Sequence, residues 1–255
     1  MIDLKSVTFA YPHTSSLFEN FSLTICRGET WAILGPSGCG KTTLLYLLAG
    51  LRQPGSGQIS VEGEILTRPR PRSGLILQDY GLLPWSTVRE NVELGLRVRK
   101  FYGEDGKHTP IDFQPGNNVP YWLKRLGLDE VADNFPSQIS GGQRQRAAIA
   151  RTLALEPDLL LMDEPFSSLD AITRGDLQNL TLNLCTEQNL TLIMVTHAIE
   201  EAVTLGKKIL LLSNAPNQCA RIFENPTAGQ NGYRSTPTYH ELCDLLWKEM
   251  HYEPT

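Results

Sequence analysis

The stretch that decides the fold of this 255-residue chain is WAILGPSGCGKTTLLYLLAGL, residues 31–51. Its first four residues form a continuous apolar run, which predicts a buried parallel strand, and its second half predicts a helix from Lys41 to about Leu51. Between strand and helix, residues 35–42 match the pattern GxxxxGK[ST], in the structural context that this motif requires. Glycines at such a turn let backbone N–H groups surround phosphate groups at the positive end of a helix. The stretch therefore predicts a phosphate-binding loop.

The residue types in this loop predict how it would bind a nucleotide. Lys41 is expected to reach the β- and γ-phosphates and to assist catalysis, and the hydroxyl of Thr42 is expected to bind Mg²⁺. The competing interpretation, a glycine-rich turn without a ligand, is weakened by the flanking strand and helix. We also expect the thiolate of Cys39 to be favoured at the helix N-terminus, so that this thiol is reactive unless MgATP covers it. The predicted nucleotide-binding residues of the loop are Gly35, Pro36, Ser37, Gly38, Cys39, Gly40, Lys41, Thr42 and Thr43.

A second apolar run ends in two carboxylates. Residues 159–162 read LLLM, and Asp163 and Glu164 follow them. At the carboxyl edge of a parallel sheet, Asp163 would hold Mg²⁺, and Glu164 is the natural catalytic group to accept a proton from the attacking water. A helix cap or a solvated turn is the ordinary explanation of an Asp-Glu pair, and it loses weight only because the phosphate-binding loop is also present.

Residues 140–143, Ser-Gly-Gly-Gln, narrow the class of protein. Many nucleotide-hydrolysing folds, including small-molecule kinases, carry the two motifs above. Two glycines at a predicted helix start are poor for helix stability, but they leave backbone N–H groups open to an anion. With Ile139 before it and RQR, residues 144–146, after it, this run resembles the signature of ATP-binding cassette (ABC) proteins. The resemblance extends over about Met1 to Ser213 and implies the ATP-hydrolysing subunit of an ABC transporter.

The resemblance assigns roles to further residues, which follow in the expected chain order. Tyr11 would stack on adenine, and Gln78 would contact Mg²⁺ and sense the attacking water during catalysis. Asp170 would communicate across a dimer, and His197 would take part in catalysis by contacting the γ-phosphate. Each residue also has an ordinary explanation. Tyr11 could be a strand-end aromatic and Gln78 a surface amide, while Asp170 could be a helix N-cap and His197 a core histidine.

The resemblance also implies partners. In ABC proteins the signature run of one subunit meets the phosphate loop of the other, so two MgATP would be bound at the interface of a head-to-tail dimer of ATPase subunits, which we expect to be identical. Transmembrane permease subunits and an extracytoplasmic solute-binding protein complete the expected assembly, without nucleic acid. The signature residues expected to bind nucleotide in this way are Ser140, Gly141, Gly142 and Gln143.

The order of predicted elements agrees with the fold that the resemblance implies. Alternating runs at residues 7–11 and 21–25 predict antiparallel strands, and later apolar runs separated by helical segments predict a mostly parallel sheet. We expect an α/β P-loop NTPase (RecA-like) core, an N-terminal antiparallel β subdomain and an α-helical signature subdomain. The predicted boundaries are residues 1–225 for the ABC ATPase domain, with the helical subdomain at about 86–155, and residues 226–255 for a C-terminal tail with one helix.

The segment after Gln78 points to a subgroup of the family. Residues 82–85 read LLPW, which resembles importers of nitrate, sulfonates, taurine or related small anions. An apolar loop tip with an aromatic anchor suits docking to a membrane subunit, although ordinary core packing would explain Trp85 equally well. The alternative function, a soluble ABC ATPase in DNA repair or translation, would share every nucleotide motif.

Bulk composition agrees with a peripheral subunit. The chain has 41% hydrophobic and 20% charged residues and a formal net charge of -5, which does not favour nucleic-acid binding. No apolar stretch approaches the roughly 20 residues of a membrane-spanning helix, and the N-terminus lacks the residue order of a secretory signal. The cysteines form no CxxC pair, so reduced thiols are expected. We therefore expect the protein at the cytoplasmic face of the inner membrane.

Overall fold

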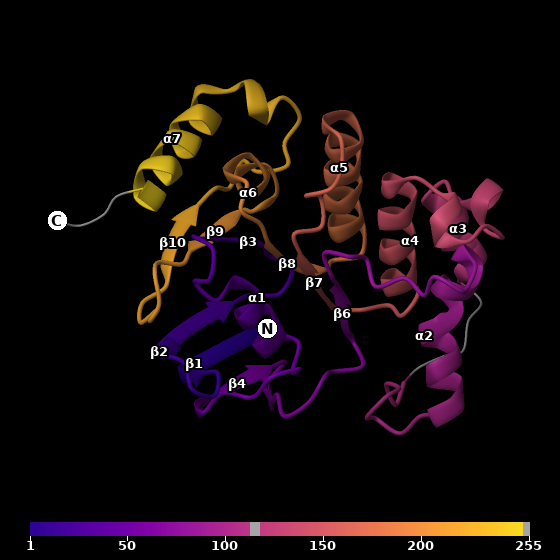
Figure 1. Ribbon diagram of the computed structural model, residues 1–255, viewed down its shortest axis with the longest axis horizontal. Coiled ribbons are helices and arrows are strands. Elements are labelled where there is room, and N and C mark those ends of the chain that lie inside the picture. Colours follow the sequence, from indigo (N-terminus) through magenta and orange to yellow (C-terminus); the bar gives the residue numbers. More distant parts are fainter. Residues whose placement is uncertain (113–117, 252–255) are drawn as a thin grey trace. The chain divides into compact units, whose positions relative to one another are not determined.

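The computed structural model describes residues 1–112 and 118–251, and the chain forms two compact units (Figure 1). The first unit comprises Met1–Pro69 and Leu182–Thr255, and the second comprises Arg70–Thr181. Helix α5 (Ala171–Glu187) begins in the second unit and ends in the first.

An antiparallel sheet in the first unit has the strand order β2-β1-β4-β5. Its strands are β1 (Ile2–Ala10), β2 (Ser16–Ile25), β4 (Ser56–Val61) and β5 (Glu64–Ile65). Buried side chains of β1 recur at every second residue on either side of an irregularity between Leu4 and Val7, where the register with β2 shifts. An extra residue at such a bulge keeps both halves of the strand facing the core. This sheet contains the two alternating runs that the sequence predicts as antiparallel strands.

The first unit also contains parallel strands around β3. β3 pairs with β8 on one side and with β9 on the other, both in parallel, and β10 pairs with β9 in antiparallel fashion. The bounds are β3 (Thr30–Leu34), β8 (Thr191–Val195), β9 (Lys208–Leu211) and β10 (Arg221–Glu224). Every residue of β3 and β8 is buried, which is why these strands read as continuous apolar runs. Helix α1 (Lys41–Leu48) packs against β8, and α6 (Ile199–Leu205) packs against β3.

Helix α1 ends earlier than the sequence predicts. The helical pattern continues to about Leu51, but the last helical residue is Leu48, and Gly50 has a left-handed backbone with a φ of 72°. The N–H of Gly50 donates to the carbonyl oxygen of Leu47 at 3.1 Å, which satisfies one of the last helical carbonyl groups. A side chain at Gly50 would overlap the carbonyl group of Arg68, so only glycine fits where the helix stops.

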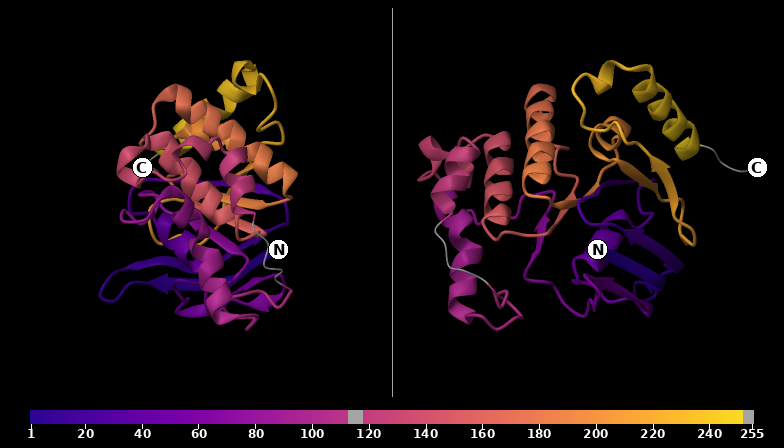
Figure 2. Two further views of the ribbon diagram at one scale, coloured as in Figure 1. Left: turned by 90° about the vertical axis from the view of Figure 1, so that its right-hand side faces the viewer. Right: turned by 180° about the vertical axis from the view of Figure 1, so that it is seen from behind.

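The C-terminal part of the first unit is helix α7 (Pro237–His251), which packs against α6 and the short helix η3 (Tyr233–Ser235) (Figures 1 and 2). Tyr239 is buried on the inner face of α7. Near the end of the helix, Glu249 forms an ion pair with Arg221 of β10. Packing and charge therefore both attach the C-terminal helix to the first unit.

The second unit combines a pair of parallel strands with helices. The strands are β6 (Ser73–Ile76) and β7 (Leu159–Asp163). Helix α4 packs against α2, α3 and β6. The helices are α2 (Val88–Tyr102), α3 (Val119–Arg125), η1 (Asp129–Val131), η2 (Pro136–Gln138) and α4 (Gly141–Leu153). All of them fall inside the segment predicted to be helical at about 86–155.

Candidate functional site

The phosphate-binding loop predicted from the sequence connects the carboxyl end of β3 to the amino end of α1. Gly38 and Gly40 have left-handed backbones, with φ of 78° and 107°, so glycine suits the path of the loop at both positions. The ammonium group of Lys41 donates to the carbonyl oxygens of Gly35 and Pro36, at 2.8 and 2.9 Å. The backbone of the loop thus holds the cation at the start of the helix, an arrangement that suits phosphate groups.

The thiol of Cys39 does not have the environment that the sequence predicts. It is 1% exposed, and its burial raises the pKa of the thiol, although the charge of Lys41 partly opposes this effect. A Cβ atom added at Gly35 would lie only 2.8 Å from the Cys39 Sγ, so the thiol packs against Gly35. The expectation of a favoured thiolate is therefore wrong, because desolvation outweighs the positive potential at the helix N-terminus.

Tyr11 lies beside the start of α1. Its hydroxyl is 3.3 Å from the hydroxyl of Thr43, and its ring packs edge-on against Phe9. The guanidinium group of Arg52 lies 5.6 Å from the centre of the Tyr11 ring. The structure thus brings Tyr11 close to the phosphate-binding loop, and its partly exposed ring suits the stacking role that the resemblance implies.

His197 follows β8 at the same edge of the sheet as the phosphate-binding loop. β3 and β8 are parallel, with Ile33 paired to Val195, so their carboxyl ends lie side by side. Between strand and histidine, the N–H of Thr196 donates to the carbonyl oxygen of Ile33 at 3.1 Å, and its hydroxyl donates to Glu201 at 2.7 Å. His197 itself is exposed, which excludes the interpretation of a core histidine.

In the second unit, the carboxyl ends of β6 and β7 carry other predicted catalytic residues. These strands are parallel, with Ile76 paired to Met162, so the segments that follow them leave the same edge. Asp163 ends β7 and is 7% exposed. Glu164 has a left-handed backbone with a φ of 45°, a strained conformation that in non-glycine residues concentrates at functional sites. The Nε2 atom of Gln78 is 3.4 Å from Oε2 of Glu164, so the structure brings these two side chains together.

The signature run forms the start of α4. The hydroxyl of Ser140 accepts from the N–H of Gln143 at 3.2 Å, and the Gln143 side chain accepts from the N–H of Ser140 at 2.9 Å, which is a capping box. A Cβ atom at Gly142 would lie 2.6 Å from the methyl group of Thr173, whereas one at Gly141 would make only an ordinary contact at 3.5 Å. A side chain at position 142 would therefore force Thr173 to shift, whereas one at position 141 would not.

Asp170 caps the start of α5. Its Oδ1 accepts from the N–H groups of Thr173 and Ile172, at 3.0 and 3.1 Å. Hydrogen bonds from Thr173 lower the pKa of the Asp170 carboxyl. This is the ordinary role of an aspartate before a helix. The communication across a dimer that the resemblance implies stays a prediction.

Trp85 lies on a turn that a buried asparagine holds in shape. Its side chain is 73% exposed, which excludes core packing as the explanation of this residue. Asn91 of α2 is fully buried, and its Oδ1 accepts from the N–H of Leu83 at 2.7 Å. Its Nδ2 lies within 3.1 Å of the carbonyl oxygens of Leu83, Ser86 and Thr87. Sequence patterns missed Asn91, because a polar residue in an amphipathic helix reads as an exposed one.

Two further residues fix the segment that follows Gln78. The hydroxyl of Tyr80 lies 2.6 Å from the hydroxyl of Ser168, just beyond the predicted catalytic glutamate. Arg151 of α4 donates to the carbonyl oxygen of Tyr80 at 2.8 Å, and burial lowers the pKa of its guanidinium group. The contact between Tyr80 and Ser168 could not be read from the sequence, because the two residues are 88 positions apart and no local signal joins them.

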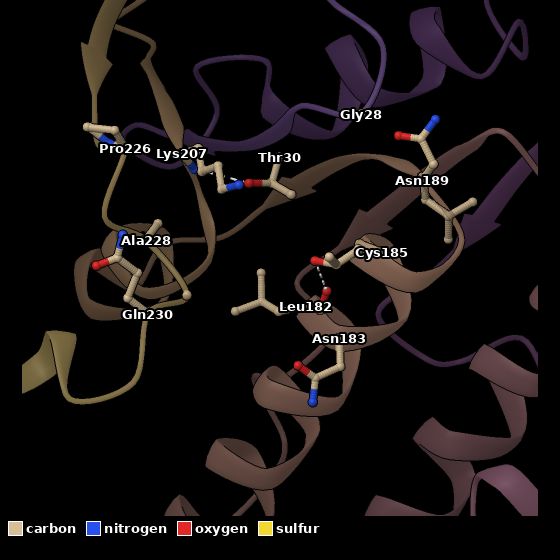
Figure 3. A pocket seen from close by; sticks show the side chains of 13 residues that line it. Gly28, Thr30, Leu182, Asn183, Cys185, Asn189, Lys207, Pro226, Ala228 and Gln230 are labelled. Carbon is tan, nitrogen blue, oxygen red and sulfur yellow. Dashed lines mark hydrogen bonds between the residues drawn. The ribbon is translucent and has the colours of Figure 1, made fainter.

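A cavity of about 340 Å³ lies at the other end of β3 (Figure 3). It is lined by Thr30 at the amino end of β3, by the last turns of α5 and by residues 226–230. The N–H of Lys207 donates to the Thr30 hydroxyl at its wall. Ligands of open α/β sheets bind at the carboxyl ends of the strands, so this cavity is separate from the phosphate-binding loop.

Comparison with known proteins shows the family. The family model described as ABC transporter matches residues 18–167, and the chain belongs to this family. It is 40% identical to the nitrate import ATP-binding protein NrtC of Synechococcus elongatus over 94% of its own length, and it spans 38% of that protein. It is 39% identical to the aliphatic sulfonates import ATP-binding protein SsuB of Bacillus cereus, covering 94% of the chain and 90% of that protein.

Solved structures of ABC ATPases share the fold. A dimeric ATP-binding cassette in a post-hydrolysis state, bound to ADP and Pi, matches with a TM-score of 0.71 and 30% identity, over 88% of this chain and 98% of that one. The cbiO1 protein of Clostridium perfringens, part of the ABC transporter complex cbiONQ, matches with a TM-score of 0.73 over 98% of this chain and 94% of that one. At 24% identity this second likeness supports the fold alone. The predicted P-loop NTPase fold is confirmed.

The family defines the general activity. The chain is an ATP-binding subunit of an ABC transporter, and ABC ATPases of this kind hydrolyse ATP to drive transport. Its relatives are named for import. Among the residues that the structure describes, no helix is long and apolar enough to cross a membrane.

Proposed function

We propose that this chain hydrolyses ATP at the cytoplasmic face of a cell membrane and couples hydrolysis to the import of a small anion. The observation that carries the proposal is similarity over 94% of the chain to ATP-binding proteins named for the import of nitrate and of aliphatic sulfonates. A bicarbonate transport ATP-binding protein of Synechococcus elongatus is also 43% identical over 78% of the chain, although the chain spans 29% of that protein. All of these named solutes are small anions, and taurine, which carries a sulfonate group, belongs to the same class.

The phosphate-binding loop and Lys41 hold the phosphate groups of ATP. Lys41 neutralises charge that is present before the reaction begins, so its main contribution is to binding. Tyr11 stacks on the adenine, which its position beside Thr43 supports. His197 contacts the γ-phosphate, which its exposed position at the same sheet edge as the loop supports.

Glu164 accepts the proton of the attacking water. Gln78 lies beside Glu164 and senses the same water. Their 3.4 Å separation and the strained backbone of Glu164 support this pairing. The oxygen donors of Thr42, Asp163 and Gln78 suit Mg²⁺, which in nucleotide sites takes one or two protein oxygens along with phosphates and would neutralise phosphate charge.

The signature residues act on the nucleotide of a second ATPase subunit. The N–H groups at the start of α4 form a positive helix end that an anion can approach. A related cassette at 30% identity was solved as a dimer with ADP and Pi. Two identical chains would then bind two ATP molecules in a head-to-tail dimer, with Asp170 at the dimer interface.

The exposed turn around Trp85 docks to the permease. An aromatic side chain held outward by a rigid turn loses little conformational freedom when a partner covers it. The hydrogen bonds from Asn91 supply that rigidity. In an importer, an extracytoplasmic protein would deliver the solute to the permease.

The test is isolation of the tagged chain from detergent-solubilised membranes, followed by reconstitution of the recovered complex in liposomes. We expect a permease to be recovered and MgATP to drive uptake of nitrate, bicarbonate or a sulfonate. Recovery of no membrane protein would contradict the role as a transporter subunit. Uptake of a sugar or a cation, with none of these anions, would contradict the solute class alone.

A further inference from the structure

A buried asparagine from the segment after β9 contacts the phosphate-binding loop. Asn217 is 2% exposed. Its Nδ2 donates to the carbonyl oxygen of Cys39 at 2.9 Å and to that of Leu17 at 3.3 Å. Its Oδ1 accepts from the N–H of Ser213 at 2.9 Å. One side-chain amide therefore joins three segments of the first unit, and one of them is the phosphate-binding loop.

The backbone of Asn217 is fixed as well. Its N–H donates to the carbonyl oxygen of Leu17 at 2.9 Å, and its carbonyl oxygen accepts from the N–H of Glu19 at 3.0 Å, so it pairs with β2 beside Phe18. Phe18 also reaches the loop, because a Cβ atom at Gly40 would lie 3.0 Å from its ring. Asn217 and this part of β2 thus form a rigid support along one side of the loop.

The bond to Cys39 controls the direction of a peptide group. The peptide group between Cys39 and Gly40 is planar, and in a trans peptide the C=O and the N–H point in opposite directions. Holding the Cys39 carbonyl oxygen on Asn217 therefore turns the N–H of Gly40 away from Asn217. In a phosphate-binding loop such N–H groups are the ligands of the phosphates, and ligands that are already oriented bind with a smaller entropic penalty.

We propose that Asn217 is a positioning residue of the nucleotide site: by holding the Cys39 carbonyl group, it keeps the Gly40 N–H oriented for phosphate. The inference rests on the proposed role of residues 35–42 as the ATP phosphate-binding loop. Asn217 acts through the loop backbone and does not itself contact the nucleotide. Because the loop binds phosphate both before and during the reaction, loss of Asn217 should weaken ATP binding with little change in the rate of the bound complex.

The substitution Asn217→Asp tests this on the full chain. It keeps the size of the side chain and the acceptor for Ser213, but it places an oxygen against the Cys39 carbonyl oxygen, where the donor was. We expect the Kd for MgATP, and the KM for ATP in the reconstituted transporter, to rise about tenfold, with kcat within about twofold, because the loss of a buried hydrogen bond is of that order. Asn217→Ala, which removes the donor without adding a negative charge near the phosphates, is measured alongside and should show the same rise in Kd and KM; an unchanged KM in Asn217→Ala would overturn the inference.

Asn225→Asp is the matched control. Asn225 is also 2% exposed, and its Nδ2 donates to the carbonyl oxygens of Val203 and Gly206, at 2.7 and 2.9 Å, with none of its hydrogen bonds to the phosphate-binding loop. The Asn225→Asp variant should lose about as much free energy of unfolding in urea as Asn217→Asp, while its KM for ATP stays unchanged. Equal KM values for the variants of Asn217 and Asn225 would overturn the inference.

A Lys41→Ala variant separates this inference from the proposed function. If Lys41→Ala loses ATP binding while Asn217→Asp binds normally, the nucleotide site stands and the positioning role of Asn217 is wrong. If Lys41→Ala binds ATP with unchanged affinity, the proposed nucleotide site itself is wrong, and the inference fails with it.

Discussion

Replacing Trp85 with alanine should separate the stability of the subunit from its assembly with a permease. The residue is 73% exposed, so roughly a quarter of a side chain that buries up to about 250 Å² is covered within the chain. That corresponds to roughly 60 Å², or about 1.5 kcal/mol at about 25 cal/mol/Å², and it is an upper bound because unfolded chains are partly compact. We therefore expect Trp85→Ala to lower the free energy of unfolding by at most about 1.5 kcal/mol.

The effect of Trp85→Ala on assembly should be larger. Truncation of an aromatic anchor at the centre of an interface typically costs about 2 kcal/mol or more, which corresponds to a rise of roughly thirtyfold in Kd. The assay is titration of the purified permease with the labelled chain, together with urea unfolding and MgATP binding of the isolated chain. ATP binding should stay within about twofold of the parental chain, because Trp85 is not among the residues assigned to nucleotide.

Two other aromatic residues of the second unit provide controls. Trp122 is 4% exposed, so Trp122→Ala should lower the free energy of unfolding by about 3–5 kcal/mol. Phe101 is 83% exposed at the far end of α2, so Phe101→Ala should change neither stability nor permease affinity. The docking role is refuted if Trp85→Ala unfolds as readily as Trp122→Ala, or if its permease affinity matches that of Phe101→Ala.

Three further predictions concern chemistry and packing. Glu164→Gln should lower kcat by about 10²–10⁴-fold while MgATP still binds and holds the chain as a dimer, which size-exclusion chromatography with light scattering would detect. A parental rate of phosphate release would show that Glu164 is not the catalytic base. Gly142→Ala should destabilise the chain by about 1–3 kcal/mol in urea, because the added Cβ overlaps a neighbouring methyl group, whereas Gly141→Ala should have little effect; equal losses would contradict this. Cys39 should be alkylated far more slowly than the exposed Cys219 in peptide mapping, since burial raises its pKa, and equal rates would show that it is accessible.

The parts of the fold that local patterns specify were predictable. The apolar run before residue 35, the glycines of the loop and the following helix lie within a single stretch, and the structure has β3, the loop and α1 in that order. Periodicity also predicted strands β1 and β2 in the antiparallel sheet. The helix end at Leu48 was missed, because the apolar pattern continues beyond it and the left-handed glycine at position 50 decides the boundary.

The environment of individual side chains was less predictable, because burial depends on contacts between distant parts of the chain. Cys39 has the local setting of an activated thiol, yet its packing against Gly35 removes it from water. Asn91 and Asn217 carry no motif, since their hydrogen-bond partners belong to turns whose paths only the folded chain defines. Sequence patterns thus predict candidate chemical groups, but they do not identify the buried polar side chains that hold the backbone around those groups.

The clamp that Asn91 forms on the Trp85 turn has a consequence for evolution and for engineering. Its partners in the turn are main-chain N–H and C=O groups, so the clamp does not depend on which side chains the turn carries. The exposed side chains of Trp85 and Ser86 can therefore change while the hydrogen bonds that hold the turn are kept. A surface whose side chains can vary while its backbone stays fixed suits a family in which related subunits recognise different partners. If the turn docks to a permease as proposed, we expect that exchanging residues 84–86 for those of a related ATPase, with Asn91 retained, would redirect the subunit to that relative's permease without changing ATP binding.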